Sequence, residues 1–148
     1  MIPLPISDEN PASRKPVVTM ALIALNAVAW LFELAHGVDL ATIEYGLIPR
    51  WILTGATSGV LQPPGFEAIS AQQPLPWPAT ILTSMFMHGS WMHIIGNMWF
   101  LWIFGDNVED AMGRGKFVVF YFACGIAAAL AQIASGPSSL APMVGASG

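Results

Sequence analysis

The sequence is poor in charged residues. Only 9% of its 148 residues are Asp, Glu, Lys or Arg, whereas 55% are hydrophobic, and soluble domains usually carry about 25% charged residues. A chain with so few charges cannot cover a water-facing surface, so much of its outside must face lipid. This scarcity excludes an ordinary soluble domain and predicts an integral membrane protein.

Cysteine is nearly absent as well. The single cysteine, Cys124, lies within an apolar run. One cysteine excludes an intramolecular disulfide and argues against a thiolate metal site. We interpret Cys124 as a small packing residue.

Three apolar stretches are long enough to cross a bilayer, because a hydrocarbon core of about 30 Å needs roughly 20 apolar residues. We expect helices over residues 17–35, 84–104 and 117–134. Together they predict an all-α fold, a polytopic membrane helix bundle whose first two helices are joined by an outer loop, residues 36–83. Residues 1–16, which contain several prolines, are expected to form a flexible cytoplasmic tail.

The outer loop mixes aromatic residues with prolines and glycines, a composition suited to the boundary between water and lipid. A loop of this length within a compact protein is usually functional or disordered. Four interleaved apolar residues, Ile48, Leu53, Val60 and Leu61, favour partial order on the bilayer surface.

Basic residues orient the three spans consistently. Arg14 and Lys15 precede the first span, Arg114 and Lys116 lie between the second and third, and only Arg50 lies in the outer loop. Because basic residues are retained on the cytoplasmic side, the N-terminus is predicted to be cytoplasmic. The last residues of the chain then enter the membrane from its outer face, as the beginning of a fourth helix.

Polar residues in the second span are candidates for chemistry. His93 and Asn97 are four residues apart, so on a helix they project from the same face. Polar side chains at membrane depth often mark a functional site, although hydrogen bonding between helices would explain the same pair. His88 precedes His93 by five residues, near the outer interface, and by itself favours a structural role.

A zinc site is the obvious alternative for two neighbouring histidines. However, helical zinc hydrolases place their histidines at i and i+4 with an intervening glutamate, and the chain contains no HExxH motif. His36 belongs to the outer loop, and no suitable carboxylate shares the face of His93. We therefore predict no metal site.

The chain ends on the small-residue motif GASG, residues 145–148, which presents one serine, Ser147. A serine at the mouth of a helix lies near backbone N–H groups that can stabilise a developing negative charge. Alone the motif says little, because Gly, Ala and Ser are common in membrane helices, where they pack closely. Its meaning comes from the other motifs of the chain.

In order, the chain carries HxxxN at His93 and Asn97, an acidic turn GDNVED at 105–110 that runs into GRGKF at 113–117, and GASG at 145–148. This combination resembles the rhomboid family of intramembrane serine proteases, and the resemblance extends from about residue 17 to 148. It implies a rhomboid-type bundle with three complete transmembrane helices and the start of a fourth.

The resemblance also implies roles for individual residues. Ser147 would be the nucleophile, and His93 and Asn97 would donate hydrogen bonds to the oxyanion of the tetrahedral intermediate. His88 would support them, and Glu109 would hold the second helix to its neighbours. The implied substrates are transmembrane or membrane-anchored proteins, the implied location is the bacterial inner membrane, and no cofactor is implied.

One element of the family pattern is missing. The family's general base is a histidine on a later helix, whereas every histidine of this sequence precedes Ser147. Since a serine hydroxyl is a poor nucleophile without a base, we expect these 148 residues to be inactive by themselves.

Two other functions remain open. A non-catalytic rhomboid-like protein that binds transmembrane helices would need the fold but not the catalytic residues. A fragment of a transporter or channel would carry charged or helix-breaking residues within its spans, and only Asn26 and Glu33 offer anything of that kind.

Overall fold

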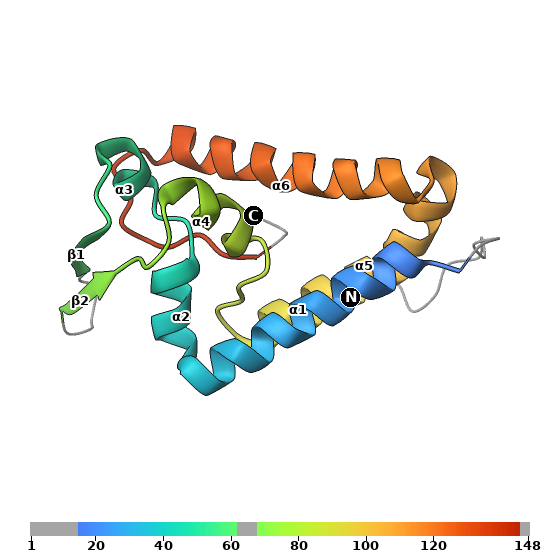
Figure 1. The fold of residues 1–148 in the computed structure, drawn as a ribbon, viewed down its shortest axis with the longest axis horizontal. Helices are drawn as coiled ribbons and strands as arrows, with labels where there is room; N and C mark the ends of the chain where they lie inside the picture. The colour runs from blue at the N-terminus through green and yellow to red at the C-terminus, as the bar shows by residue number, and fades with distance from the viewer. Residues whose placement is uncertain (1–14, 62–67, 146–148) are drawn as a thin grey trace, which may run out of the picture.

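The computed structural model describes residues 15–61 and 68–145 of the chain. The described part is mostly helical and contains one small antiparallel sheet (Figure 1). In chain order, its elements are α1 (Val17–His36), α2 (Val38–Tyr45), α3 (Pro49–Thr54), β1 (Ser58–Leu61), β2 (Ile69–Gln72), α4 (Trp77–Ser84), α5 (Trp91–Met112) and α6 (Arg114–Ser135). The expected tail lies almost wholly outside the described residues, as does Ser147.

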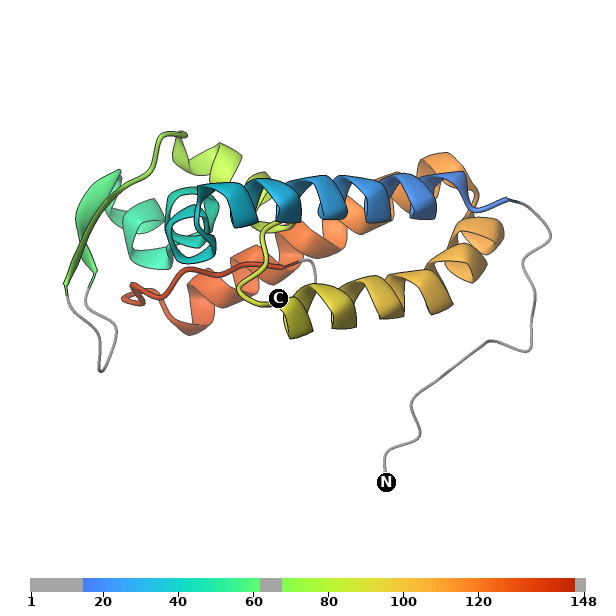
Figure 2. The same ribbon diagram turned by 90° about the horizontal axis from the view of Figure 1, so that it is seen from below.

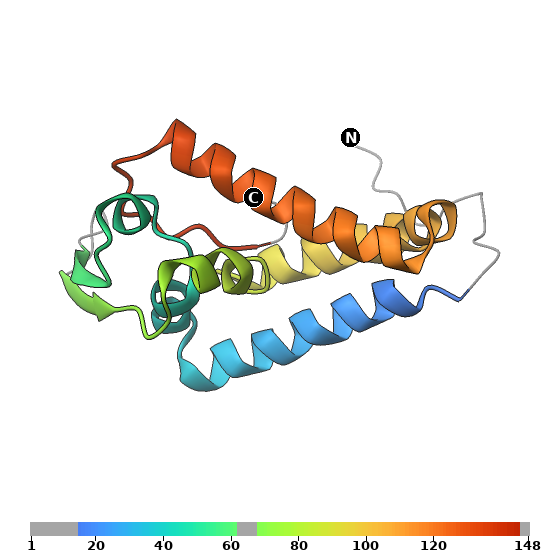
Figure 3. The same ribbon diagram turned by 45° about the horizontal axis from the view of Figure 1, so that its top comes forward.

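The three long helices α1, α5 and α6 make contact in pairs, and α5 lies along α1 (Figures 1 and 2), whereas α6 is close to α1 near the starts of both helices and diverges from it toward their ends (Figures 1 and 3). Two of them, α1 and α6, are long and apolar enough to cross a membrane. Both expose large apolar side chains, such as Val28 and Leu31 on α1 and Val119 on α6. In a bilayer these side chains would contact lipid, which fits the membrane protein predicted from composition.

The buried face of α1 is unusually polar. Its buried residues recur at spacings of three or four, which places them on one side of the helix, and they are Thr19, Leu22, Asn26, Trp30 and Glu33. The amide of Asn26 donates to the Leu22 carbonyl within the same helix, over 2.8 Å. Another polar residue of this face, Thr19, donates its hydroxyl to Glu109 of α5, so the polar face also bonds a neighbouring helix.

The second long helix differs from the predicted span. The sequence predicted a helix over 84–104, whereas α5 covers Trp91–Met112 and is not among the helices apolar enough to count as candidate spans. The side chain of Ser90 caps α5 by accepting a hydrogen bond from the His93 amide, at 3.2 Å. The apolar residues just before the cap, Met85 and Met87, are buried in the loop between α4 and α5. Their apolarity reflects tertiary packing and not a membrane helix.

The expected outer loop is ordered into α2, α3, the β1–β2 hairpin and α4. An apolar cluster joins α2, α3 and the two strands, and it consists of Ile43, Ile48, Trp51, Leu61 and Ala71. The predicted partial order is therefore present. Of the four apolar residues that suggested it, Ile48 and Leu61 are buried, whereas Leu53 and Val60 are exposed.

The sheet was not predicted. Its register pairs Ser58 with Gln72 and Leu61 with Ile69. A β-carbon at Gly59 would lie 3.3 Å from the indole of Trp51, so the small residue lets the strand lie against that ring. The all-α expectation therefore holds for the long helices, and the outer loop adds a strand pair to it.

After α6 the chain doubles back toward the middle of the molecule (Figures 1 and 3). We call residues 136–145 the return segment. It exchanges backbone hydrogen bonds with the outer loop, because Leu47 and Met143 bond each other in both directions, at 3.0 and 2.7 Å. The Arg50 amide donates to Ser139 at 3.1 Å, and the Gly145 amide donates to the Ser84 carbonyl at 2.8 Å.

Small residues on α6 let another element approach closely, although the partner is a side chain. Gly125 and Ala129 are both buried. A β-carbon at Gly125 would overlap the thioether of Met85, which follows α4. The small residues thus accept a side chain from the α4–α5 loop.

Candidate active site

The HxxxN pair lies on the first two turns of α5, facing the last described residue of the chain. A β-carbon placed on Gly145 would lie 2.5 Å from His93 Nε2 and 3.3 Å from Asn97 Nδ2. Gly145 is the first residue of the GASG motif. The structure therefore brings the HxxxN pair and the start of GASG into direct contact, although their residues are about 50 positions apart in the sequence.

Only glycine fits at position 145. Its φ is +96°, a left-handed conformation that residues with a β-carbon rarely adopt. Its amide is tied to Ser84 at the end of α4. Ser147, the candidate nucleophile, follows two residues later and lies outside the described residues.

Asn97 presents an unused donor. Its Nδ2 atom is buried and has no hydrogen-bond partner within the described part of the chain. Buried amide donors are almost always bonded, so an unused one marks a place where a partner is expected. Both His93 and Asn97 are partly buried, with their polar atoms turned toward the return segment.

His88 lies beside this pair, in the loop between α4 and α5. It is fully buried, and its ring packs edge-on against the His93 ring, with centroids 5.1 Å apart. Its Nδ1 lies 3.1 Å from the Phe86 carbonyl, which can only accept, so Nδ1 carries the proton and Nε2 the lone pair. Burial lowers the pKa of His88 to about 4, with a further contribution from His93, so its imidazole is neutral at neutral pH.

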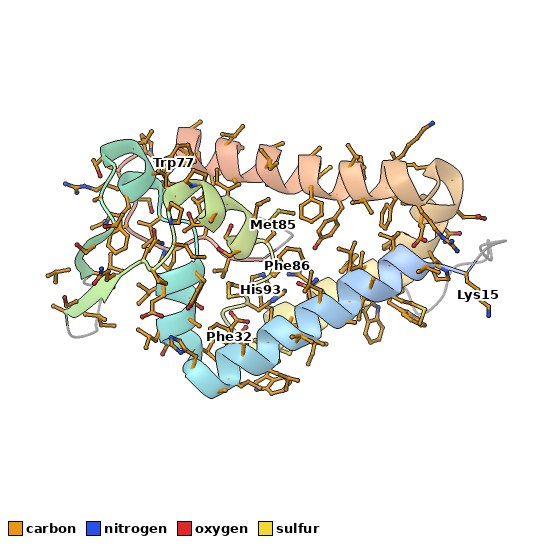
Figure 4. The ribbon with its side chains drawn as sticks, viewed as in Figure 1. Lys15, Phe32, Trp77, Met85, Phe86 and His93 are labelled. Carbon is orange, nitrogen blue, oxygen red and sulfur yellow. The ribbon has the colours of Figure 1, made fainter. Side chains whose placement is uncertain are left out.

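The α4–α5 loop reaches the centre of the molecule, where Met85, Phe86 and His93 gather (Figure 4). The Phe86 ring contacts Tyr121 and Phe122 of α6. The backbone amide of His88 donates to Oε1 of Glu33 on α1, at 2.7 Å. The loop that precedes His93 is therefore held from two sides, by α6 and by α1.

Glu33 is the site residue that sequence reasoning missed. Its only signal was a carboxyl group interrupting an apolar helix, at a position on the same face as Asn26 and Trp30. That signal marks a buried polar group but does not name the partner, which lies 55 residues away.

Glu109 lies at the opposite end of α5. Its carboxylate accepts hydrogen bonds from the Val18 amide at 3.1 Å, and from the Thr19 amide and hydroxyl at 2.8 and 2.9 Å. Sixteen residues of helix, about 24 Å, separate it from His93. It borders a cavity of about 370 Å³ lined by charged groups of both signs, including Asp106 and Arg114. The structure thus leaves Glu109 apart from the His93 cluster.

No group of three or more metal-ligating side chains occurs within residues 15–61 and 68–145. The chemistry available in the described part of the site is therefore hydrogen-bond donation from His93 and Asn97, next to a glycine that leads into a serine.

The geometry agrees with a family comparison, in which the model of the Rhomboid domain matches residues 77–148. This part of the chain is therefore similar to the rhomboid family. The matched residues include α4, α5 and α6 of the rhomboid domain, the HxxxN pair and the GASG motif. The resemblance predicted from the motifs is therefore confirmed. No curated protein and no solved structure matches the chain.

Proposed function

We propose that this rhomboid domain is part of an intramembrane serine endopeptidase that cleaves transmembrane or membrane-anchored proteins. The proposal rests on one observation above all, the contact of Gly145 with His93 Nε2 and Asn97 Nδ2. Ser147 follows Gly145 by two residues in the sequence, and Gly145 itself lies beside two side-chain donors. A helix bundle that only bound other helices would not need the HxxxN pair, the GASG motif and the contact between them.

In the proposed reaction, Ser147 Oγ attacks the carbonyl carbon of the scissile peptide bond and forms a tetrahedral intermediate. His93 and Asn97 donate hydrogen bonds to the oxygen that becomes negative, and collapse of the intermediate expels the amine and leaves an acyl-enzyme. Water then hydrolyses the ester. The unused Nδ2 donor of Asn97 suits this role, because it gains its partner only when the oxyanion forms.

The general base must take the Ser147 proton and return it to the leaving amine. His88 is a poor candidate, because burial lowers its pKa to about 4, which makes its Nε2 a weak base, and because its ring is buried against His93. His93 would act as the donor and could not serve as the base in the same step. We propose that the base is a histidine on a later helix, as in the family pattern, and that the reaction occurs near the outer face of the membrane, with the N-terminus cytoplasmic.

The nucleophile is tested by covalent labelling of the gene product that carries these 148 residues. A fluorophosphonate probe should label it, and Ser147→Ala should abolish labelling, whereas Ser138→Ala, an exposed serine of the return segment, should leave labelling intact. Labelling that survives Ser147→Ala would show that Ser147 is not the nucleophile.

The oxyanion donors are tested by kinetics in the same protein. Loss of one such donor typically costs about 10² to 10³ in rate, so His93→Ala with Asn97→Ala should lower kcat by at least that factor. His36→Ala is the matched control, since His36 lies at the end of α1 and pairs with Glu44 at 2.7 Å. Turnover within about tenfold of wild type would contradict the assignment.

A non-catalytic rhomboid-like protein is the alternative outcome of these tests. It would bind transmembrane helices without labelling or turnover, even in a chain that supplies the later histidine. Ser147→Ala would then leave every measurable property of the protein unchanged.

A further inference from the structure

Glu33 is a carboxyl group with no exposed surface, on a helix apolar enough to cross a membrane. Burying such a group is costly unless it is well bonded. One oxygen, Oε1, accepts the His88 amide at 2.7 Å, whereas Oε2 is buried and has no hydrogen-bond partner among the described residues. Stability alone does not account for a half-bonded carboxyl group at this position.

The bond from Glu33 reaches the backbone that sets the start of α5. His88 is two residues before Ser90, which caps the helix through the His93 amide. One turn away on α1, Trp30 packs edge-on against Trp91, the first residue of α5, with centroids 5.1 Å apart. The end of α1 thus contacts both the loop and the first turn of the helix that carries the HxxxN pair.

The same loop places the His88 ring against the His93 ring. Glu33 bonds the backbone of His88, and the Phe86 carbonyl bonds its ring. The His88 ring is therefore fixed in place where it packs against His93. His93 also lies against Gly145, so its imidazole contacts both His88 and the return segment. A shift of the His88 backbone would therefore move the His93 ring away from its position.

We propose that Glu33 is a positioning residue for the oxyanion site: it holds the His88 backbone, and through the His88 ring it fixes the direction of His93 Nε2. This inference rests on the proposed function. It assigns Glu33 a role as a hydrogen-bond acceptor at a defined position, and not as a charge.

Two conservative variants separate position from charge. Glu33→Gln keeps the length of the side chain and an acceptor oxygen but cannot ionise. Glu33→Asp keeps the carboxyl group, but its side chain is shorter by one methylene group. We expect Glu33→Gln to retain kcat within about threefold and Glu33→Asp to lower it at least tenfold with KM little changed, since a misplacement of about 1 Å can cost up to 10² in rate. The opposite order would overturn the proposal.

A matched control lies on the same helix. Thr19 is as buried as Glu33, and its side chain also bonds α5, but at the Glu109 end. Thr19→Val should lower the thermal midpoint without lowering kcat. If Thr19→Val and Glu33→Asp lowered kcat equally, loosening of the α1–α5 contact would explain both and the positioning role would be excluded.

Amide exchange at His88 gives a readout that needs no catalysis. In the detergent-solubilised protein, Glu33→Asp should speed exchange of the His88 amide at least tenfold, and Glu33→Gln should leave it near the wild-type rate, because the first loses the acceptor and the second keeps it. Unchanged exchange in Glu33→Asp would refute the contact. A wild-type protein without labelling or turnover would instead refute the proposed function, and the exchange rates would still decide whether Glu33 holds the His88 backbone.

Discussion

The carboxylate of Glu109, on α5, caps the first turn of α1 by accepting the amide and hydroxyl of Thr19 at 2.8 and 2.9 Å. The residue before α1 is Pro16, whose side chain cannot cap. A helix start leaves several amides unbonded and favours negative charge. The second long helix thus supplies the cap that the sequence of the first lacks.

Removing this cap should destabilise the bundle. Glu109→Ala leaves buried N–H groups of α1 without an acceptor, and we expect the free energy of unfolding to fall by about 2 kcal/mol. Denaturation in mixed micelles measures the change. Asp106→Asn is the control, because the Asp106 carboxylate accepts from the neighbouring Asn107 amide, at 2.7 Å, within α5 itself. Equal destabilisation by both variants would contradict a specific cap.

Gly145→Ala should damage catalysis more than folding. The new methyl group would lie 2.5 Å from His93 Nε2, and φ of +96° would add backbone strain. We expect kcat to fall by about 10² in the active gene product. Gly115→Ala is the matched control, since a β-carbon there meets nothing within 4 Å and lies within α6, where alanine is favoured. Unimpaired turnover in Gly145→Ala would show that His93 does not lie against this glycine in the working enzyme.

The contact of Met85 with Gly125 predicts coupled mutations. Gly125→Val should destabilise the protein by about 1 to 3 kcal/mol, because the methionine already fills the space. Combining it with Met85→Ala should recover part of that loss, since the smaller loop residue leaves room. A double-mutant cycle of unfolding free energies tests this. Strictly additive losses would argue against the contact.

Gln73 should be essential to the order of the outer loop. Its amide donates to the Ile43 carbonyl at 3.2 Å and to the Gly46 carbonyl at 2.7 Å, joining the chain after β2 to the end of α2. Gln73→Leu should speed proteolytic cleavage of the loop, because two buried carbonyls lose their donor. Gln72→Leu, at the exposed neighbouring position, should not. Identical cleavage rates for the two variants would be evidence against this anchor.

The sequence located α1 and α6 well because each is a long apolar run that follows basic residues. It misplaced the start of α5, because Met85 and Met87 are apolar for reasons of tertiary packing, and composition does not separate such residues from a membrane helix. The hairpin was missed for a related reason: its Gly59 lies against Trp51, a tertiary contact that no periodic pattern in the sequence indicates.

The sequence predicted which residues form the candidate site, but not the contacts between them. The HxxxN pattern placed His93 and Asn97 on one helical face, and the structure adds that Gly145 lies against them. The link from Glu33 to His88 spans 55 residues and has no periodic signature, so it became apparent only in the folded chain. Ser147 as the nucleophile remains a prediction.

The return segment is held to the outer loop through main-chain groups of Leu47, Arg50 and Ser84. Main-chain hydrogen bonds place few demands on side-chain identity, whereas they are sensitive to the number of residues between the bonded groups. We therefore expect this part of the outer loop to tolerate substitutions better than changes of spacing around Leu47. A single inserted residue there should displace the GASG motif more than many substitutions would.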